Sequence, residues 1–135
     1  MCGRFSQTAT PAMIAQQFDV APPPLFAPRY NIAPSQPVVA IRIAPDTATR
    51  QLLLLRWGLI PSWAKDPKIG HQCINAKAET VAEKPSFRAA FKKRRCLVIA
   101  TGFYEWQVQE RAKQPMWIGL KSHRPFAFAG LWEQW

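Results

Sequence analysis

The sequence has few cysteines and no hydrophobic run long enough to cross a membrane. Its three cysteines are an odd number and too few for a disulfide framework, so a disulfide-stapled secreted fold is excluded and a reducing, intracellular setting fits best. The longest apolar stretches are strand-sized, whereas a membrane span needs roughly 18 to 20 consecutive apolar residues. The N-terminus, MCGRFSQTAT, lacks the charged and apolar regions of a secretory signal. These absences favour a cytoplasmic protein with no membrane partner.

Acidic residues are also scarce. Eight Asp and Glu stand against eighteen Lys and Arg, which gives a net charge of +10 and a pI near 10.2. Such an excess in a small domain favours a polyanionic partner, most often nucleic acid, and a charge that only aids solubility is the alternative. The basic residues are densest between Lys84 and Arg95, where a helix would place Arg88 and Lys92 on one face. Phosphates are a plausible target for this cluster, and a solvated helix face is the alternative.

The remaining composition is sufficient for one folded domain. The chain has 135 residues, of which 48% are hydrophobic, and this size and composition allow a genuine core. We find no internal repeat and no linker, so residues 1–135 are expected to form a single domain.

The pattern of apolar residues predicts mostly strands. Thr10 and Pro11 are typical of a helix start, and the prolines of 21–24 end that helix. A second helix is expected from 87 to about 94, capped by Ser86. Strands are expected at 38–43, 52–57, 95–100, 103–106, 116–120 and 126–131. The first two should pair as a hairpin, and the strand at 52–57 should be buried. The last two strands stand on either side of a turn at 122–125. The expected fold class is α+β and mostly β, with a barrel-like, curved, antiparallel or mixed sheet and short helices.

Cys2 has the most distinctive chemistry in the sequence. If Met1 is removed, Cys2 becomes N-terminal and carries an amine and a thiol on adjacent carbons. The amine titrates at about 7.7 to 8.0 and an ordinary thiol at about 8.5, so both are partly reactive near neutral pH. A 1,2-aminothiol reacts with aldehydes: the amine condenses to a Schiff base, and the thiol closes a five-membered thiazolidine. The alternative is a chance cysteine with no chemical role.

Two polar residues are candidates to assist this reaction. Glu105 lies between the aromatic Tyr104 and Trp106, and a carboxylate among aromatic side chains is desolvated, which favours the protonated form needed for acid/base work. An edge-strand Glu that points to water is the alternative. The amide of Asn75 both donates and accepts hydrogen bonds, so it could orient an amine or a sugar oxygen, although an Asn in a loop usually serves a turn.

A metal site is not expected. His71 and Cys73 are close in sequence, and Cys2 and Cys96 are available. However, the chain has neither a Cys-x-x-Cys nor a His-x-x-x-His spacing, so zinc is not supported. No cofactor is expected either.

Five sequence blocks occur in the order that is found in one known family. They are MCGRF at 1–5, RYNIAP at 29–34, WGLIPSW at 57–63, NAKAET at 75–80, and RCL at 95–97 continuing to GFYEW at 102–106. On these blocks, which extend over nearly all of the chain, the sequence resembles the SRAP (SOS response-associated peptidase) family. The resemblance implies an SRAP-like fold and a DNA-damage-response protein that binds single-stranded DNA and captures the aldehyde of an abasic site as a covalent thiazolidine crosslink.

The resemblance also assigns roles to particular residues. It implies that Cys2 is the nucleophile and imine former, that Glu105 transfers protons, and that Asn75 positions the Cys2 amine or the sugar. A second set would contact DNA, through phosphates or flanking bases: Arg4, Asn31, Pro34, Trp63, Lys77 and Arg88.

The sequence departs from the family pattern in two places. Lys77 stands where the family usually has Arg, which keeps the charge but loses the bidentate geometry for phosphate. The family also has an active-site His in a His-x-Arg-x-Pro block beyond residue 135, and neither His71 nor His123 matches it. The sequence is therefore expected to lack the C-terminal part of the family domain and to leave a sheet edge exposed.

The sequence is also compatible with two other functions. One is a module that binds single-stranded DNA without a covalent step. The other is a thiol autopeptidase that removes Met1, since Cys2 has no free amine while Met1 is attached.

Overall fold

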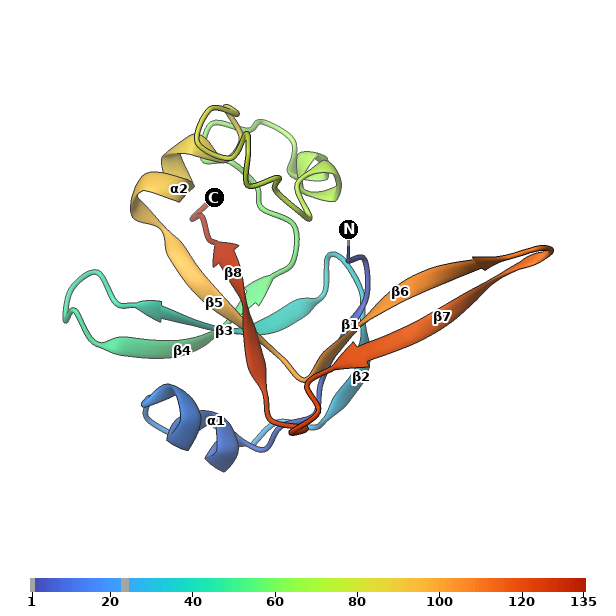
Figure 1. Cartoon of the computed structure of the whole chain (residues 1–135). Helices are drawn as coiled ribbons and strands as arrows, with labels where there is room; N and C mark the ends of the chain where they lie inside the picture. Colours follow the sequence, from blue (N-terminus) through green and yellow to red (C-terminus); the bar gives the residue numbers. More distant parts are fainter. Residues whose placement is uncertain (1, 23–24) are drawn as a thin grey trace.

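Two four-stranded antiparallel sheets form the framework of the computed structural model, which describes residues 2–22 and 25–135 (Figure 1). The first sheet contains, in spatial order, β2 (Arg29–Ile32), β1 (Phe5–Gln7), β6 (Gly102–Gln109) and β7 (Ala112–Gly119). The second contains β4 (Arg50–Arg56), β3 (Pro37–Ile43), β5 (Arg95–Ala100) and β8 (Phe126–Leu131). The helices are α1 (Pro11–Phe18), the 3-10 helix η1 (Pro67–Gln72) and α2 (Arg88–Lys93).

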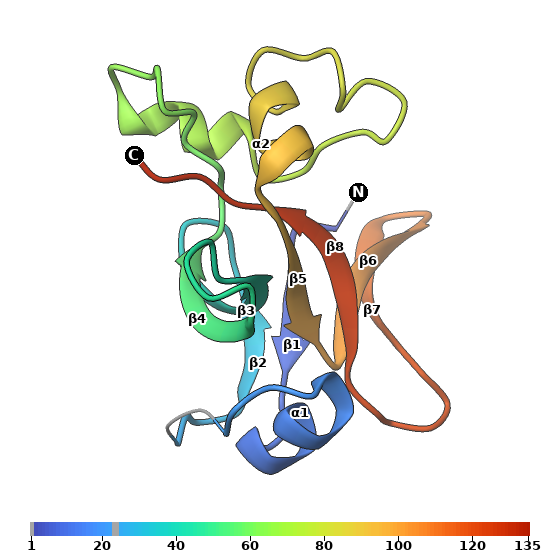
Figure 2. The same ribbon diagram turned by 90° about the vertical axis from the view of Figure 1, so that its left-hand side faces the viewer.

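This architecture confirms the mostly-β fold class with short helices. The two sheets are not closed into a barrel: Figure 2 shows β5 and β8 crossing in front of the first sheet, with α1 at one end and α2 at the other. The predicted hairpin is also confirmed, because β3 and β4 pair from Pro37 and Arg56 to Ile43 and Arg50.

One expectation about the strands is wrong. The segment 52–57 was expected to be buried, yet Leu54 of β4 is 63% exposed, because β4 has β3 as its one sheet neighbour and forms an edge. The strands on either side of the turn at 122–125 belong to different sheets, since β7 pairs with β6 whereas β8 pairs with β5. The turn, with His123 in the left-handed region at φ 56°, carries the chain from one sheet to the other.

The first helix begins as its sequence predicts. The hydroxyl of Thr10 accepts a 3.2 Å hydrogen bond from the Met13 N–H, and Pro11 occupies the first helical position. Ile14 is completely buried and packs α1 against Ile41 and Ile99 of the second sheet. The capping role expected for Ser86 is wrong, because Phe87 is the N-cap residue of α2 and makes no side-chain cap.

A second apolar cluster, next to the N-terminus, joins the two sheets and includes Phe5 of β1 and Val38 of β3. Phe5 of β1 contacts the rings of Trp57 and Phe128 at centroid distances of 5.2 and 5.8 Å, and it is 2% exposed. Since aromatic rings bury large areas, these contacts fix β1 against the second sheet. The position of the residues just before Phe5 follows from this anchoring.

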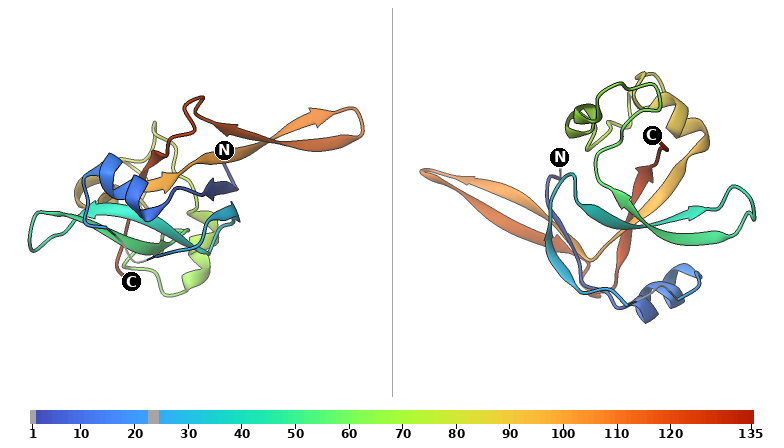
Figure 3. Two further views of the ribbon diagram at one scale, coloured as in Figure 1. Left: turned by 90° about the horizontal axis from the view of Figure 1, so that it is seen from below. Right: turned by 180° about the vertical axis from the view of Figure 1, so that it is seen from behind.

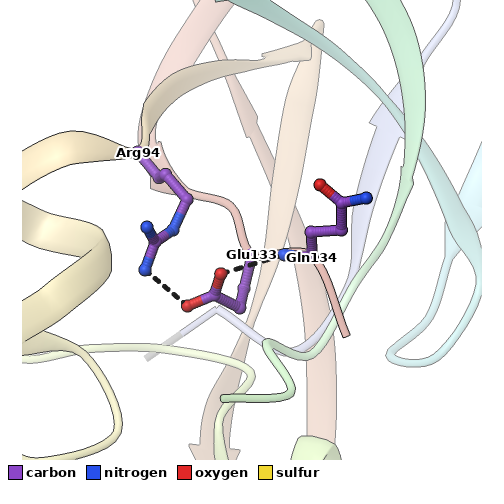
Figure 4. A network of polar contacts seen from close by, with 3 residues as sticks. All are labelled: Arg94, Glu133 and Gln134. Carbon is purple, nitrogen blue, oxygen red and sulfur yellow. Dashed lines mark hydrogen bonds and ion pairs between the residues drawn. The ribbon is translucent and has the colours of Figure 1, made fainter. Parts of the chain in front are cut away.

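The segment between β4 and β5 crosses over the end of the second sheet, where it contains η1 and α2 (Figure 1). Its start depends on Gly58, which has φ +113°; a Cβ at this position would lie 2.6 Å from the carbonyl oxygen of Gly70. The other end of this region is held by an ion pair of 2.6 Å between Arg94 and Glu133, and Glu133 also accepts a 3.0 Å hydrogen bond from the Gln134 N–H (Figure 4).

The β6–β7 hairpin extends away from the rest of the molecule, as Figures 1 and 3 show. Its strands pair from Gly102 and Gly119 to Gln109 and Ala112, so both predicted strands are longer than the sequence pattern indicated. Within the described ranges, no helix is long and apolar enough to cross a membrane.

Candidate functional site

Cys2 lies directly before β1, half-buried against the Phe5 cluster. Its thiol donates a hydrogen bond of 3.1 Å to the carbonyl oxygen of Arg4. Burial raises the pKa of the Cys2 thiol most strongly, the Arg4 backbone acts in the opposite direction, and the negative charge of Glu105 raises the pKa further. The thiol is therefore held in its protonated form at neutral pH.

Asn75 contacts Cys2 from the segment that follows η1. Its amide nitrogen Nδ2 donates a 2.7 Å hydrogen bond to the carbonyl oxygen of Cys2. The loop that carries Asn75 is fixed to the end of β4, because the indole N–H of Trp57 donates to the Ile74 carbonyl at 2.8 Å. Two segments that are 73 residues apart in sequence thus meet at the N-terminus.

Glu105 approaches the same point along β6. Phe5 pairs with Phe103 in the antiparallel register, and the Tyr104 N–H donates to the Arg4 carbonyl at 2.9 Å. Continued by two residues, this register places Glu105 level with Gly3, next to Cys2. The effect of its charge on the Cys2 thiol agrees with this position. The side chain of Glu105 is partly exposed, so it can exchange protons with solvent.

Arg4 and Asn31 are neighbours on the outer side of this site. The guanidinium of Arg4 donates to the Asn31 side-chain oxygen at 3.3 Å. Tyr30, which precedes Asn31 in β2, is held by Tyr104, whose hydroxyl donates to the Tyr30 carbonyl at 2.8 Å. Positive charge and an amide therefore stand together beside the N-terminal strand.

The other residues predicted to bind DNA lie elsewhere on the surface. Trp63 is 58% exposed in the loop before η1, Lys77 is exposed two residues after Asn75, and Arg88 is exposed at the start of α2. Pro34 is half-buried in the loop that follows β2. Among the polar contacts of the described residues, none connects these four side chains with Cys2.

A cavity of about 710 Å³ opens beside the site. Cys2 and Asn75 form part of its wall. The rest of its wall is largely apolar and comes mainly from the second sheet, from α2 and from the segment between β4 and α2, with Val98, Phe91 and Trp57 among the lining side chains. The charged residues in the wall are Arg56, Arg95 and Glu133. Cys2 therefore lies between its polar neighbours, Asn75 and Glu105, and this largely apolar cavity.

Two residues in the site were not predicted to act there. Trp57 positions the Asn75 loop, and Tyr104 bonds to Arg4, just before β1, through its backbone N–H and to Tyr30 of β2 through its hydroxyl. Both occur in the sequence blocks that carry the family resemblance, which was the one available signal. In 2–22 and 25–135, no group of three or more His, Cys, Asp or Glu side chains is placed to hold a metal ion.

The arrangement suits a reaction in which an amine and a thiol on one residue attack the same carbon. The donor on Asn75 fixes the backbone of Cys2, a carboxylate stands close to its thiol, and cationic and amide groups flank it. This is a suitable environment for condensation with a carbonyl compound, since that reaction needs a positioned nucleophile and a proton carrier.

Comparison with known proteins identifies relatives over the entire length. The family described as "SOS response associated peptidase (SRAP)" matches residues 1–135. The abasic site processing protein YoaM of Bacillus subtilis (strain 168) is 49% identical over 139 residues, which is 100% of this chain and 60% of that protein. The abasic site processing protein HMCES of Xenopus tropicalis is 40% identical over 103 residues, covering 69% of this chain and 31% of that protein.

Solved structures show the same fold. A protein from Bacteroides thetaiotaomicron superimposes with a TM-score of 0.81 at 26% sequence identity, over 97% of this chain and 61% of the other. A phage-related protein from Bordetella bronchiseptica gives a TM-score of 0.74 at 29% identity, over 96% of this chain and 60% of the other. The chain spans about three fifths of the length of the Bacillus relative and of these two proteins.

Proposed function

The chain belongs to the SRAP family, and from this premise we propose that it processes abasic sites in DNA by capturing the aldehyde of the lesion through Cys2. The relatives named as abasic site processing proteins support this reaction class. The observation that carries the proposal is the convergence of Asn75 and Glu105 on Cys2 from separate parts of the chain.

The reaction begins at the amine of Cys2, once Met1 has been removed. The ring-opened sugar of an abasic site presents an aldehyde, and the amine adds to its carbonyl carbon. The resulting carbinolamine loses one water when Glu105 donates a proton to the departing hydroxyl, which leaves a protonated imine and the carboxylate of Glu105. Asn75 holds the Cys2 carbonyl through its 2.7 Å hydrogen bond, so the amine is presented in one orientation.

The thiol of Cys2 completes the ring. It adds to the carbon of the protonated imine, the electrons of the C=N bond pass to the nitrogen, and the thiol proton returns to the carboxylate of Glu105, so one thiazolidine and one water are formed from one aminothiol and one aldehyde. Because burial raises the pKa of the thiol, the sulfur is largely neutral until the imine is present. This order protects the thiol from other electrophiles before DNA binds.

We propose that the DNA in this reaction is single-stranded. The net charge of +10 favours the phosphate backbone, and exposed Trp63 offers a face on which an unpaired base can stack. Arg4 and Asn31 lie beside Cys2 and would contact the nucleotide next to the lesion. Lys77 and Arg88 extend the positive surface toward α2, and Pro34 adds apolar surface. Such a protein would act in the compartment that holds the DNA, which in a bacterium is the cytoplasm.

Intact mass spectrometry tests this proposal. The protein is measured before and after incubation with a single-stranded oligonucleotide that carries one abasic site. A new species at the mass of protein plus oligonucleotide minus one water is expected from the Met1-free protein, and Cys2→Ala should bind the oligonucleotide without forming it. Binding without any adduct from a Met1-free sample would identify the non-covalent module instead.

The peptidase alternative has its own readout in the same spectra. An autopeptidase would retain Met1 when Asn75 or Glu105 is replaced by Ala, in cells whose methionine aminopeptidase is inhibited. Equal removal of Met1 in all variants would argue against autocatalysis and would leave the crosslinking reaction intact.

A further inference from the structure

The apolar cavity beside Cys2 is not used by the reaction described above. An abasic sugar and its phosphates are polar, and they are expected to lie on the side of Arg4 and Asn31. The cavity, with a volume of about 710 Å³, has Cys2 and Asn75 in its wall and is otherwise lined mainly by apolar side chains. It is large enough to enclose a small organic molecule, for which cavities of roughly 300 to 1,000 Å³ are typical.

We propose that Cys2 also captures free aldehydes with an apolar chain, and that the chain lies in this cavity. The inference rests on the proposed reaction of Cys2, because an aminothiol selects aldehydes whatever group they carry. The cavity would then select among aldehydes, since an apolar chain gains free energy in proportion to the area that it removes from water. The product is again a thiazolidine, formed from one aminothiol and one aldehyde with the release of one water.

The lining favours an alkyl chain over a nucleobase. A buried base needs hydrogen-bond partners for the polar edge that it loses to the cavity. The lining from the sheet is mainly apolar, with Leu55 and Val98, and its charged members are Arg56 and Arg95. Two other polar groups of the wall already have partners, because the indole N–H of Trp57 is bonded to Ile74 and Glu133 is paired with Arg94. An alkyl chain needs no such partner, so a straight-chain aldehyde meets the requirements of both the cavity and Cys2.

The test compares straight-chain aldehydes of two to eight carbons. Met1-free protein and the free peptide Cys-Gly-Arg-Phe, which has the same aminothiol without the cavity, are each equilibrated with every aldehyde. The fraction of adduct at the mass of protein plus aldehyde minus one water is then measured, with Cys2→Ala as the control for attachment elsewhere. For the protein, the apparent affinity relative to the peptide is expected to rise up to about fourfold for each added methylene that the cavity encloses.

Two variants test whether the cavity is responsible. Phe91 lines the cavity and is 39% exposed, so Phe91→Gln makes the wall more polar at little cost to folding. Val98→Thr changes the wall on the sheet side with almost no change in shape. Both are expected to flatten the dependence on chain length. Leu54, which is 63% exposed on β4 and lies outside the cavity wall, provides the matched control Leu54→Gln and should leave it unchanged.

The outcomes separate this inference from the proposed function. If the protein captures acetaldehyde but follows the peptide over the whole series, the cavity does not bind the chain and this inference is wrong, while the reaction of Cys2 stands. If Met1-free protein captures neither acetaldehyde nor an abasic site, the proposed function fails and this inference fails with it. Competition gives further support if octanal slows crosslinking to abasic DNA more than acetaldehyde does at equal concentration.

Discussion

The amide of Asn75 donates a 2.7 Å hydrogen bond to the carbonyl oxygen of Cys2. This contact ties the segment after η1 to the N-terminus, and it fixes the peptide group next to the proposed nucleophile. Its energetic contribution is that of one partly buried hydrogen bond, about 1 kcal/mol. Since the amine of Cys2 must approach an aldehyde carbon in one direction, loss of this bond should affect the reaction more than it affects DNA binding.

We therefore expect Asn75→Ala to crosslink abasic DNA about fivefold more slowly than wild type, because a loss of about 1 kcal/mol in the transition state is a little less than one factor of ten in rate. Single-turnover crosslinking rates at saturating DNA measure this effect, and fluorescence anisotropy measures the affinity for DNA, which should change little. Gln107→Ala is a matched control, because Gln107 has an exposed side-chain amide on β6. Equal rates for Asn75→Ala and Gln107→Ala would contradict the positioning role.

The charge of Glu105 makes a prediction about the ionisation of Cys2. Burial and the negative charge of Glu105 both raise the pKa of the thiol. Glu105→Gln removes the charge, so the thiolate should appear at a lower pH than in wild type. Alkylation of Cys2 by iodoacetamide, followed across pH 6 to 10 by peptide mapping, measures this shift. The crosslinking rate should fall in the same variant, because the amide cannot carry protons.

Glu110→Gln is the control for this experiment. Glu110 carries the same charge at the tip of the β6–β7 hairpin and is exposed, so its replacement should leave the alkylation profile of Cys2 where it is. A profile that moves equally in both variants would show a general effect of net charge and would remove Glu105 from its proposed role.

Long, strongly patterned elements could be predicted from the sequence, whereas short ones could not. The strands β3, β5 and β8 each have at least six residues, and their β-branched and apolar runs predicted them within one residue. β1 and β2 have three and four residues, which is too short for a period of two to be distinct from chance. Local patterns also do not specify partners, so the runs at 116–120 and 126–131 did not indicate that β7 pairs with β6 and β8 with β5.

The site was only partly accessible from the sequence. The chemistry of Cys2 could be inferred from its position after Met1 alone, but nothing local indicated that Asn75, 73 residues away, lies against it. That prediction came from the family resemblance. The roles of Trp57 and Tyr104 depend on bonds from their side chains to backbone carbonyls of distant segments, and such bonds leave no sequence pattern of their own.

The turn at Gly58 makes a prediction about stability. Gly58 has φ +113°, and a Cβ would lie 2.6 Å from the Gly70 carbonyl oxygen, so Gly58→Ala must distort the loop that leads to Asn75. A loss of about 1 to 3 kcal/mol in the free energy of unfolding is expected, measured by urea denaturation. Gly3→Ala is the control, because a Cβ at Gly3 meets no atom within 4 Å. Equal stability of the two variants would show that the loop relaxes without cost.

Cys96 predicts how stability depends on pH. Burial raises the pKa of the Cys96 thiol above its ordinary value to about 11, although the Arg42 charge acts against this. The unfolded chain therefore ionises Cys96 at a lower pH than the folded chain does. The resulting stabilisation is complete below pH 9 and is lost as the pH rises toward 11. The free energy of unfolding should fall over this range by on the order of 2 kcal/mol.

Cys96→Ala separates this contribution from the other groups that titrate in the same range. Unfolding free energies of wild type and variant are measured by urea denaturation at pH 8 and at pH 10.5. The wild type should lose more stability than the variant between these two conditions. Parallel losses would mean that Cys96 ionises equally in both states.

The last prediction concerns the DNA path. If single-stranded DNA runs from Cys2 over Lys77 to α2, the exposed Arg88 neutralises one phosphate. Arg111 belongs to the turn between β6 and β7, and this hairpin extends away from the body of the protein (Figure 1). Each phosphate contact with a single strand contributes about 0.7 to the slope of log affinity against log salt. Arg88→Ala should therefore reduce the slope by about 0.7 and weaken binding to all sequences alike. Arg111→Ala makes the same change in net charge and should leave the slope almost unaltered. A reduction of equal size in both variants would show that binding depends on the total charge and not on a path over α2.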